Sequence, residues 1–272
     1  ELAYAYYDYL AALELIGRAK ISAEKLNDRD MLAATYHHLG MVFQALYKYS
    51  VALDCYTQSL EIAQELGNRS GEATTLHQIG MVHQMMHRYD EALDYYNQSL
   101  GIKRELGDRA YEVSTLHQIG TVYEATHRYA EALDYYNQSL AIARELGNRE
   151  YEASTLHQIG MVYLRKHRYD EALDCYTQSL AIVRELGNRG GEAKVLHQIG
   201  AMYLEMHRYD KAMDCYTQSL AIRGDLGDRA GEAGTLHQIG IVYQAMHRYA
   251  EALECYNQSL AIERELGNLG NE

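Results

Sequence analysis

The chain has 272 residues, of which 47% are hydrophobic and 23% are charged, so its composition is that of a folded protein rather than a disordered one. Its formal net charge of −13 argues against a binder of duplex nucleic acid, which needs a basic face. No segment has the roughly 18 apolar residues of a membrane span, and the start of the chain lacks a signal-peptide layout, which favours a cytoplasmic protein with no membrane partner.

A period of 40 residues runs through the whole chain without a slip. The pentapeptide LHQIG occurs five times at this step, beginning at Leu76, and a blurred copy, YHHLG, precedes it at Tyr36. The chain also has no proline, which suits uninterrupted helices because proline breaks them. A fixed period of this length predicts an array of stacked structural repeats.

The first 30 residues match the second half of a repeat, since Tyr9, Ala12 and Leu26 keep the phase of the period. We expect residues 1–30 to hold the end of one helix followed by a complete second helix. The chain then starts inside a helix and without an initiating methionine, so we expect it to be a piece of a longer array. Six repeats follow, at residues 31–70, 71–110, 111–150, 151–190, 191–230 and 231–272, the last with a short tail.

Each repeat opens with the pattern of a capped helix, which we call its first helix. In the second repeat Asn68 is suited to the N-cap, and Ala73, Leu76, Ile79 and Val82 have helical spacing. Asparagine or aspartate returns at the cap position in the later repeats, at Asp108, Asn148, Asn188 and Asp228.

A second helix follows the turn at His87-Arg88. Asp90 and Glu91 complement the positive end of this helix, which ends before Gly107, a residue well suited to the C′ position. Both helices should be about 17 residues, or about 25 Å, long. Because one antiparallel pair cannot bury both of its faces, the pairs must stack, which predicts an all-α solenoid.

These residues resemble the tetratricopeptide repeat. The family's Leu-Gly in the first helix is matched by Ile79-Gly80, and its tyrosine before the second helix by Tyr89. Its small residues and aromatic in the second helix are matched by Ala92, Ser99 and Tyr96. The resemblance covers essentially the whole chain, and it implies a right-handed superhelix whose first helices line a concave groove that binds a protein segment.

The repeat departs from the common tetratricopeptide pattern in two respects. It has 40 residues rather than about 34, with longer helices and no proline after the second one. In this it is similar to the arrays of kinesin light chains, Pins-type polarity scaffolds and bacterial signalling ATPases. The family's glycine between the helices is replaced by histidine, as at His87, for which a left-handed conformation is less easy but possible.

On each first helix, residues that follow a 3–4–3 spacing form a stripe that faces the inside of the superhelix. The residue types in this stripe differ between repeats, whereas those at the packing positions barely change. This variation favours a groove with individual contacts for a protein or peptide partner. Arg165 and Lys194 are the expected basic anchors, and Met81 and Met161 the adaptable apolar ones. The predicted partner-binding residues are His77, Met81, Gln84, His117, Thr121, Glu124, His157, Met161, Arg165, Lys194, His197 and His237.

The histidine of LHQIG has four interpretations. It can form a ladder that bonds an extended peptide, hold metal ions, act as a pH switch, or pack against the next repeat. Metal binding is disfavoured because equivalent histidines should lie about 10 Å apart, whereas metal–nitrogen bonds are about 2 Å long. The pH switch needs a two-state element, which the sequence does not reveal.

The remaining motifs predict neither catalysis nor a cofactor. Cys55, Cys175, Cys215 and Cys255 share one column of the repeat, too far apart for disulfides, and are expected to be reduced. The glycine-rich segment 187–194 lacks the spacing of a phosphate-binding loop and no strand precedes it. We therefore expect a non-enzymatic interaction module that belongs to a larger signalling protein.

A second hypothesis is structural self-association. In the last helix Leu260 and Ile262 have no following repeat to cover them within this sequence. Bare ends of solenoids tend to stack, which predicts possible end-to-end association.

Overall fold

The computed structural model describes residues 2–269, with side chains described for 14–267. These residues form thirteen helices and contain no strand. The helices are α1 (Leu2–Leu26), α2 (Arg29–Ala45), α3 (Tyr49–Glu65), α4 (Arg69–Met85), α5 (Tyr89–Glu105), α6 (Arg109–Ala125), α7 (Tyr129–Glu145), α8 (Arg149–Arg165), α9 (Tyr169–Glu185), α10 (Arg189–Glu205), α11 (Tyr209–Leu226), α12 (Arg229–Ala245) and α13 (Tyr249–Leu269).

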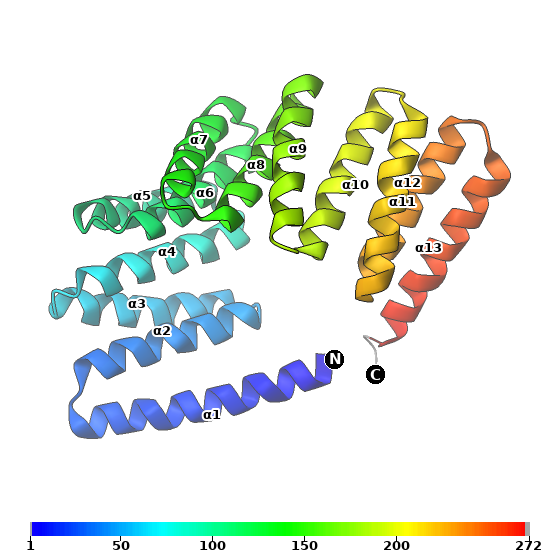
Figure 1. Cartoon of the computed structure of the whole chain (residues 1–272). Coiled ribbons are helices and arrows are strands. Elements are labelled where there is room, and N and C mark those ends of the chain that lie inside the picture. Colours follow the sequence, from blue (N-terminus) through cyan, green and yellow to red (C-terminus); the bar gives the residue numbers. More distant parts are fainter. Residues whose placement is uncertain (1, 270–272) are drawn as a thin grey trace. The chain divides into compact units, whose positions relative to one another are not determined.

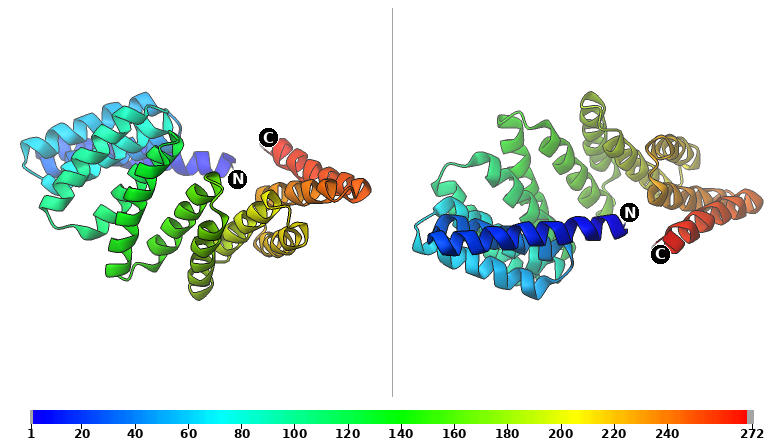
Figure 2. Two further views of the ribbon diagram at one scale, coloured as in Figure 1. Left: turned by 90° about the horizontal axis from the view of Figure 1, so that it is seen from above. Right: turned by 90° about the horizontal axis from the view of Figure 1, so that it is seen from below.

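The chain divides into two compact units, residues 1–142 and 143–272. In the first unit α2 packs on α3 and α4 on α5, and in the second α8 packs on α9, α10 on α11 and α12 on α13. Figure 1 shows these hairpins following one another along the chain, and both views of Figure 2 show the same pairing. Within each unit the predicted all-α stack of helix pairs is confirmed.

The residues that begin and end the helices have the predicted roles. Asn68 Oδ1 accepts a hydrogen bond from the Gly71 backbone N–H at 2.9 Å, which satisfies one of the free donors at the start of α4. Gly107 has a φ of 69°, in the left-handed region that glycine adopts without strain. The same cap and the same glycine return at the other repeats, so helix length is set locally.

The turn between the two helices of a repeat contains a left-handed histidine. His87 has a φ of 58°, and its Nδ1 lies 2.9 Å from the Tyr89 hydroxyl. The pair is repeated at 127 and 129, 167 and 169, 207 and 209, and 247 and 249, with φ values of 54–59°. Histidine therefore adopts at this turn the left-handed conformation that glycine adopts more easily.

The core of each repeat is a tyrosine ring placed against a glycine. Tyr96 is fully buried, and a Cβ on Gly80 would lie 2.8 Å from its ring. On the same helix the Ser99 hydroxyl donates to the Ala73 carbonyl oxygen at 2.7 Å. The two helices therefore approach closely because one of them has no side chain at this point.

We expect Gly80→Ala to destabilise the protein by about 1–3 kcal/mol, because the new methyl group overlaps a fully buried ring. Gly101→Ala is the matched control: Gly101 is also helical, but nothing lies within 4 Å of its added Cβ. That change should stabilise by about 0.5–1 kcal/mol through helix propensity. Urea unfolding of both variants measures the difference, and equal effects would contradict the close approach at Gly80.

Residues 1–30 differ from expectation at one point. The end of a first helix and a separate second helix were predicted there, but α1 is one continuous helix over Leu2–Leu26. Extending a helix is easier than forming a turn and a new nucleus, and the segment before Tyr9 is too short to pair as a helix of its own. Tyr9 and Ala12 lie outside the residues whose side chains are described.

Candidate functional site

The inward stripe of the first helices contains both open and engaged side chains. Arg165, Lys194 and His237 are exposed, whereas Met81 and Met161 are half-buried. His77 is 6% exposed. The other predicted partner-binding residues, Gln84, His117, Thr121, Glu124, His157 and His197, are half-buried.

Three of the half-buried residues join the two helices of a repeat through hydrogen bonds. Gln84 Oε1 accepts a hydrogen bond from the Tyr96 hydroxyl at 2.7 Å, and Glu124 Oε2 accepts one from the Tyr136 hydroxyl at 2.9 Å. Tyr136 also donates to the Thr121 hydroxyl at 3.2 Å. Gln84, Thr121 and Glu124 were predicted as partner contacts, and each already has a bond inside its own repeat.

The fifth repeat lacks this tie because Leu204 stands where Gln84 stands in the second. The Tyr216 hydroxyl is buried and has no hydrogen-bond partner among the described side chains. We expect Tyr216→Phe to be neutral or stabilising, since it removes an unsatisfied polar atom. Tyr96→Phe should instead cost about 1 kcal/mol, since it leaves Gln84 without its donor. Thermal unfolding of the pair tests this, and a larger loss for Tyr216→Phe would refute it.

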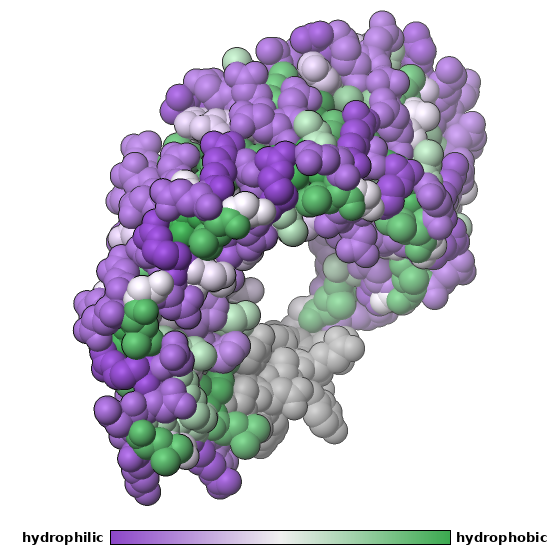
Figure 3. Space-filling model, turned by 60° about the vertical axis from the view of Figure 1, so that its left-hand side comes forward, coloured by the Kyte–Doolittle hydropathy of each residue, from purple (hydrophilic) through white to green (hydrophobic). Residues whose placement is uncertain are grey.

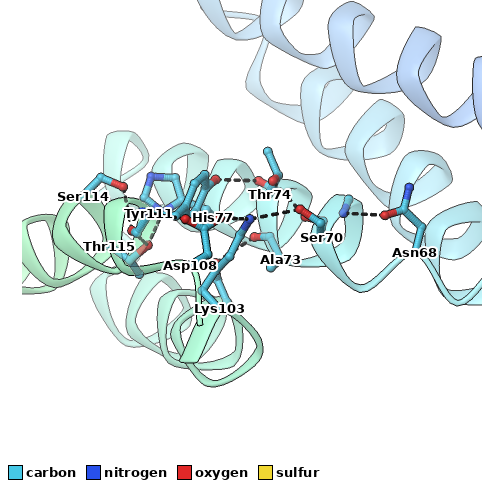
Figure 4. Close-up of polar contacts among 12 residues, drawn as sticks. Asn68, Ser70, Ala73, Thr74, His77, Lys103, Asp108, Tyr111, Ser114 and Thr115 are labelled. Atoms are coloured by element: carbon cyan, nitrogen blue, oxygen red, sulfur yellow. Dashed lines mark hydrogen bonds and ion pairs between the residues drawn. The ribbon is translucent and has the colours of Figure 1, made fainter. Parts of the chain in front are cut away.

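The LHQIG histidine joins one first helix to the next. His77 Nδ1 lies 3.1 Å from the Thr115 hydroxyl of the following repeat, and the centre of its ring lies 5.3 Å from that of Tyr111 (Figure 4). Within its own repeat, the centre of the Tyr96 ring lies 5.2 Å away. Equivalent contacts join His37 to Thr75 at 3.2 Å and His197 to Thr235 at 3.3 Å. Among the four interpretations, this geometry favours packing against the next repeat.

Burial keeps this histidine neutral. Loss of solvent lowers the pKa of His77 to about 4, with a smaller contribution from the nearby ammonium of Lys103. Burial also lowers the pKa of His117 to about 4. Because His77 is buried and its Nδ1 is already engaged by threonine, it is not an open groove contact.

The junction between α8 and α10 is an exception. Val195 replaces the threonine there, and the buried His157 Nδ1 has no hydrogen-bond partner among the described residues. Burial and the charge of Lys194 together lower the pKa of His157 to about 4. Lys194 and Val195 are adjacent in the sequence and differ from the residues at these positions in the other repeats. Their joint effect on the His157 imidazole was not predicted from the repeat pattern.

A buried lysine was also missed from the sequence. Lys103 is 2% exposed, and its ammonium donates to the Ser70 hydroxyl at 3.2 Å and to Asp108 Oδ2 at 3.0 Å. It also lies 4.2 Å from the centre of the Tyr111 ring. Figure 4 shows it between the second and third repeats, where most other repeats place a small or apolar residue.

Metal and thiol chemistry find no support in the described part of the chain. No group of three or more histidine, cysteine, aspartate or glutamate side chains there has the arrangement of a metal site. The cysteines Cys55, Cys175, Cys215 and Cys255 are free thiols. Burial raises the pKa of Cys175 and Cys215 to about 11, which keeps both protonated and unreactive at neutral pH.

An open pocket of about 290 Å³ lies between α4 and α6 in the first unit. It brings together the predicted residues Met81 and Gln84, and it adds Gln118. The pocket exists because the column that holds Met85 in the second repeat holds Ala125 in the third. The other lining residues are Met85, Ala125, His87 and Tyr89. On the face in Figure 3 the surface is mostly hydrophilic, with hydrophobic residues in separate patches.

Tetratricopeptide repeat models match residues 66–145 and 151–225, and others of the same description match 32–66 and 233–266. The chain belongs to the tetratricopeptide repeat family. No curated protein sequence matches it. None of the helices within residues 2–269 of this tetratricopeptide array is long and apolar enough to cross a membrane.

Solved structures share the fold of this tetratricopeptide array at low identity. BtubC (BKLC) from P. vanneervenii is 21% identical, with a TM-score of 0.70 over 78% of this chain and 89% of that one. A Rap protein complexed with competence and sporulation factor is 16% identical, with a TM-score of 0.64 over 88% and 76%. A putative kinesin light chain of P. anserina with nearly identical repeats is 19% identical, with a TM-score of 0.61 over 73% and 97%.

Proposed function

We propose that this array is a protein-interaction module whose first helices bind a protein or peptide segment. The observation that carries the proposal is the pocket between α4 and α6. Met81 and Met85 supply adaptable apolar contacts, and the Gln118 amide supplies a donor and an acceptor for a peptide backbone. An apolar side chain of the partner enters the pocket while its backbone bonds the amide.

The family and the shared fold support this kind of partner. Tetratricopeptide proteins are generally non-catalytic scaffolds, and a Rap protein of the same fold holds a bound factor. Arg165 and Lys194 are exposed on first helices of the second unit, where they serve as basic anchors for the same class of segment. We further propose that the array is the sensor or scaffold part of a larger cytoplasmic signalling protein.

A display library of random peptides, selected on the wild-type array, tests the pocket. Ala125→Met introduces in the third repeat the methionine that the second repeat has as Met85. Because Ala125 is exposed and lines the pocket, the longer side chain fills the pocket. We expect selected peptides to lose at least about tenfold in affinity for this variant, or about 1.4 kcal/mol. Ala45→Met, in the same column and also exposed, is the control and should bind normally.

Hydrogen exchange then locates the bound segment. A peptide bound as proposed slows exchange of amides in α4 and α6. Protection confined to second helices such as α5 and α7, or equal binding to both methionine variants, would refute the site.

A second candidate function is self-association through α13. Leu253 is 61% exposed and Leu260 is 42% exposed, whereas the equivalent Leu93 and Leu100 of α5 are buried. A second copy of the chain that stacks on α13 would cover them. Sedimentation across a concentration series should then show a dimer that Leu253→Glu abolishes, and a monomer at every concentration would exclude this role.

A further inference from the structure

A buried glutamate holds consecutive repeats together. Glu112 lies in the first turn of α6 and is 4% exposed. Its Oε1 accepts a hydrogen bond from Arg104 Nε of the preceding repeat at 2.7 Å, and its Oε2 accepts one from Arg109 at 2.7 Å. Burial alone raises the pKa of this carboxyl, but the hydrogen bonds from the two arginines outweigh it and hold the pKa below its usual value. The Glu112 carboxylate is therefore charged and bridges two guanidinium groups.

The preceding arginine also reaches the second helix of the next repeat. Arg104 donates to Gln138 Oε1 at 3.4 Å, and Arg144 donates to Gln178 Oε1 at 3.0 Å. We call the glutamate Oε1 and the glutamine Oε1 together the guanidinium cradle. In the next cradle, Arg144 Nε donates a hydrogen bond to Glu152 Oε1 at 2.9 Å. Arg184 Nε likewise donates to the corresponding Glu192 Oε1 at 2.8 Å.

The fifth repeat lacks the arginine of the cradle. Its second helix reads AIRGDLG where the third reads AIARELG, so Gly224 stands at the arginine position and Arg223 stands one residue earlier. Arg223 donates to Asp228 Oδ2 at 2.8 Å and to the Ser219 hydroxyl at 3.3 Å, and it does not replace the missing bond to Glu232. Glu232 keeps its bond from Arg229, which reaches Oε2 at 2.6 Å.

A pocket of about 410 Å³ lies at this cradle, between α11, α12 and α13. Its polar lining includes Glu232 and Gln258, which correspond to the glutamate and glutamine that hold Arg104. A Cβ on Gly224 would lie 3.1 Å from Glu232 Oε1, so a side chain at this position starts beside the empty acceptor, and the flexible Glu232 side chain shifts slightly to make room for it. The rest of the lining is Leu220, Arg229, Leu236, Ala261, Ile262 and Glu265.

The glutamine amide keeps the orientation that serves a guanidinium. Gln178 directs its Nε2 to Asp174 at 2.8 Å while its Oε1 accepts from Arg144. Gln258 likewise directs its Nε2 to Glu254 at 3.5 Å, which leaves its Oε1 for the pocket. The acceptors for a guanidinium are therefore present without the group itself.

We propose that this pocket binds the guanidinium group of an arginine side chain from a partner protein. The planar fork of a guanidinium bridges two acceptors at once, which the point charge of a lysine ammonium does less well. Two carboxylates, Glu232 and Glu265, outnumber the single cation Arg229 at the site, and the chain as a whole carries a net charge of −13. Leu220, Leu236 and Ile262 contact the methylene stem of the arginine.

The pocket is reachable in a continued array as well. The arginines that fill the equivalent cradles, Arg104, Arg144 and Arg184, have side chains 48–49% exposed although a further repeat follows each of them. None of the lining residues belongs to the predicted partner-binding residues of the first helices. The site is thus separate from the proposed groove.

N-acetyl-arginine amide is the probe, and NMR titration of the whole chain is the measurement. We expect saturable shifts confined to residues of α11–α13, with a dissociation constant of millimolar order, about −4 kcal/mol. N-acetyl-lysine amide should bind about tenfold more weakly. Equal shifts from the two compounds, or shifts spread over all repeats, would overturn the proposal.

Gly224→Arg supplies the missing group from within the chain and should abolish binding of the probe. It should also raise the unfolding temperature by about 2–4 °C more than Gly234→Arg, the control that gains helix propensity at an exposed helical glycine that does not line the pocket. Glu232→Gln keeps the shape and should weaken binding at least about fivefold. Undiminished binding to Gly224→Arg, or no stabilisation beyond the control, would refute the cradle.

Discussion

Lowering the pH from 7 to 5 should reduce the free energy of unfolding by several kcal/mol. Burial lowers the pKa of His77, His117, His157 and His197 to about 4, against about 6.5 in the unfolded chain. Because the unfolded chain then binds more protons, the stability from each histidine is complete above pH 6.5 and is lost progressively as the pH falls toward 4. Between pH 7 and pH 5, each histidine therefore reduces the free energy of unfolding by about 2 kcal/mol.

Chemical unfolding at several pH values measures this loss. His77→Gln should flatten the pH dependence by the share of one histidine, since glutamine does not titrate. His87→Gln is the control, because it makes the same substitution at a histidine that lies exposed in the turn. If stability is flat between pH 7 and 5, the histidine column is not buried and neutral as described.

Tyr96→Ala should destabilise by about 3–5 kcal/mol, the largest effect expected of a single substitution here. The change removes a fully buried ring from the space between Gly80 and the second helix, and it leaves Gln84 without its donor. Tyr47→Ala, which truncates a tyrosine 75% exposed, should stay within about 0.5 kcal/mol.

Urea unfolding followed by circular dichroism compares the two variants. The loss in Tyr96→Ala should come with faster hydrogen exchange in α4 and α5, since neighbours in a stacked array share their stability. A loss no larger than that of Tyr47→Ala would mean that the ring is not a core element.

Much of the fold follows from short-range rules that a sequence expresses directly. The helix starts at Asn68 and Asp108 and the left-handed ends at Gly67 and Gly107 depend on residues within one turn of one another. The spacing of the packing residues is periodic, and repetition at 40 residues reinforces each signal. The continuity of α1 and the extension of α13 past Gly267 to Leu269 depart from this pattern.

The site was less predictable, because it depends on which side chains from different helices meet. The sequence placed His77 on an inward stripe and left both a partner contact and packing against the next repeat open. Its burial and its bond to Thr115, 38 residues away, favour packing. Gln84 and Glu124 are likewise engaged by tyrosines of the second helix, which helical spacing alone does not show.

The sequence by itself determined the repeat, the lengths of its helices, their caps and the family, since all of these rest on local chemistry copied at a fixed step. Tertiary structure decided the histidine contacts, the buried Lys103 and the empty cradle at Glu232. These depend on packing between repeats. In the fifth repeat Gly224 occupies the arginine column and Arg223 precedes it, and this shift of one residue changes which acceptor the guanidinium reaches.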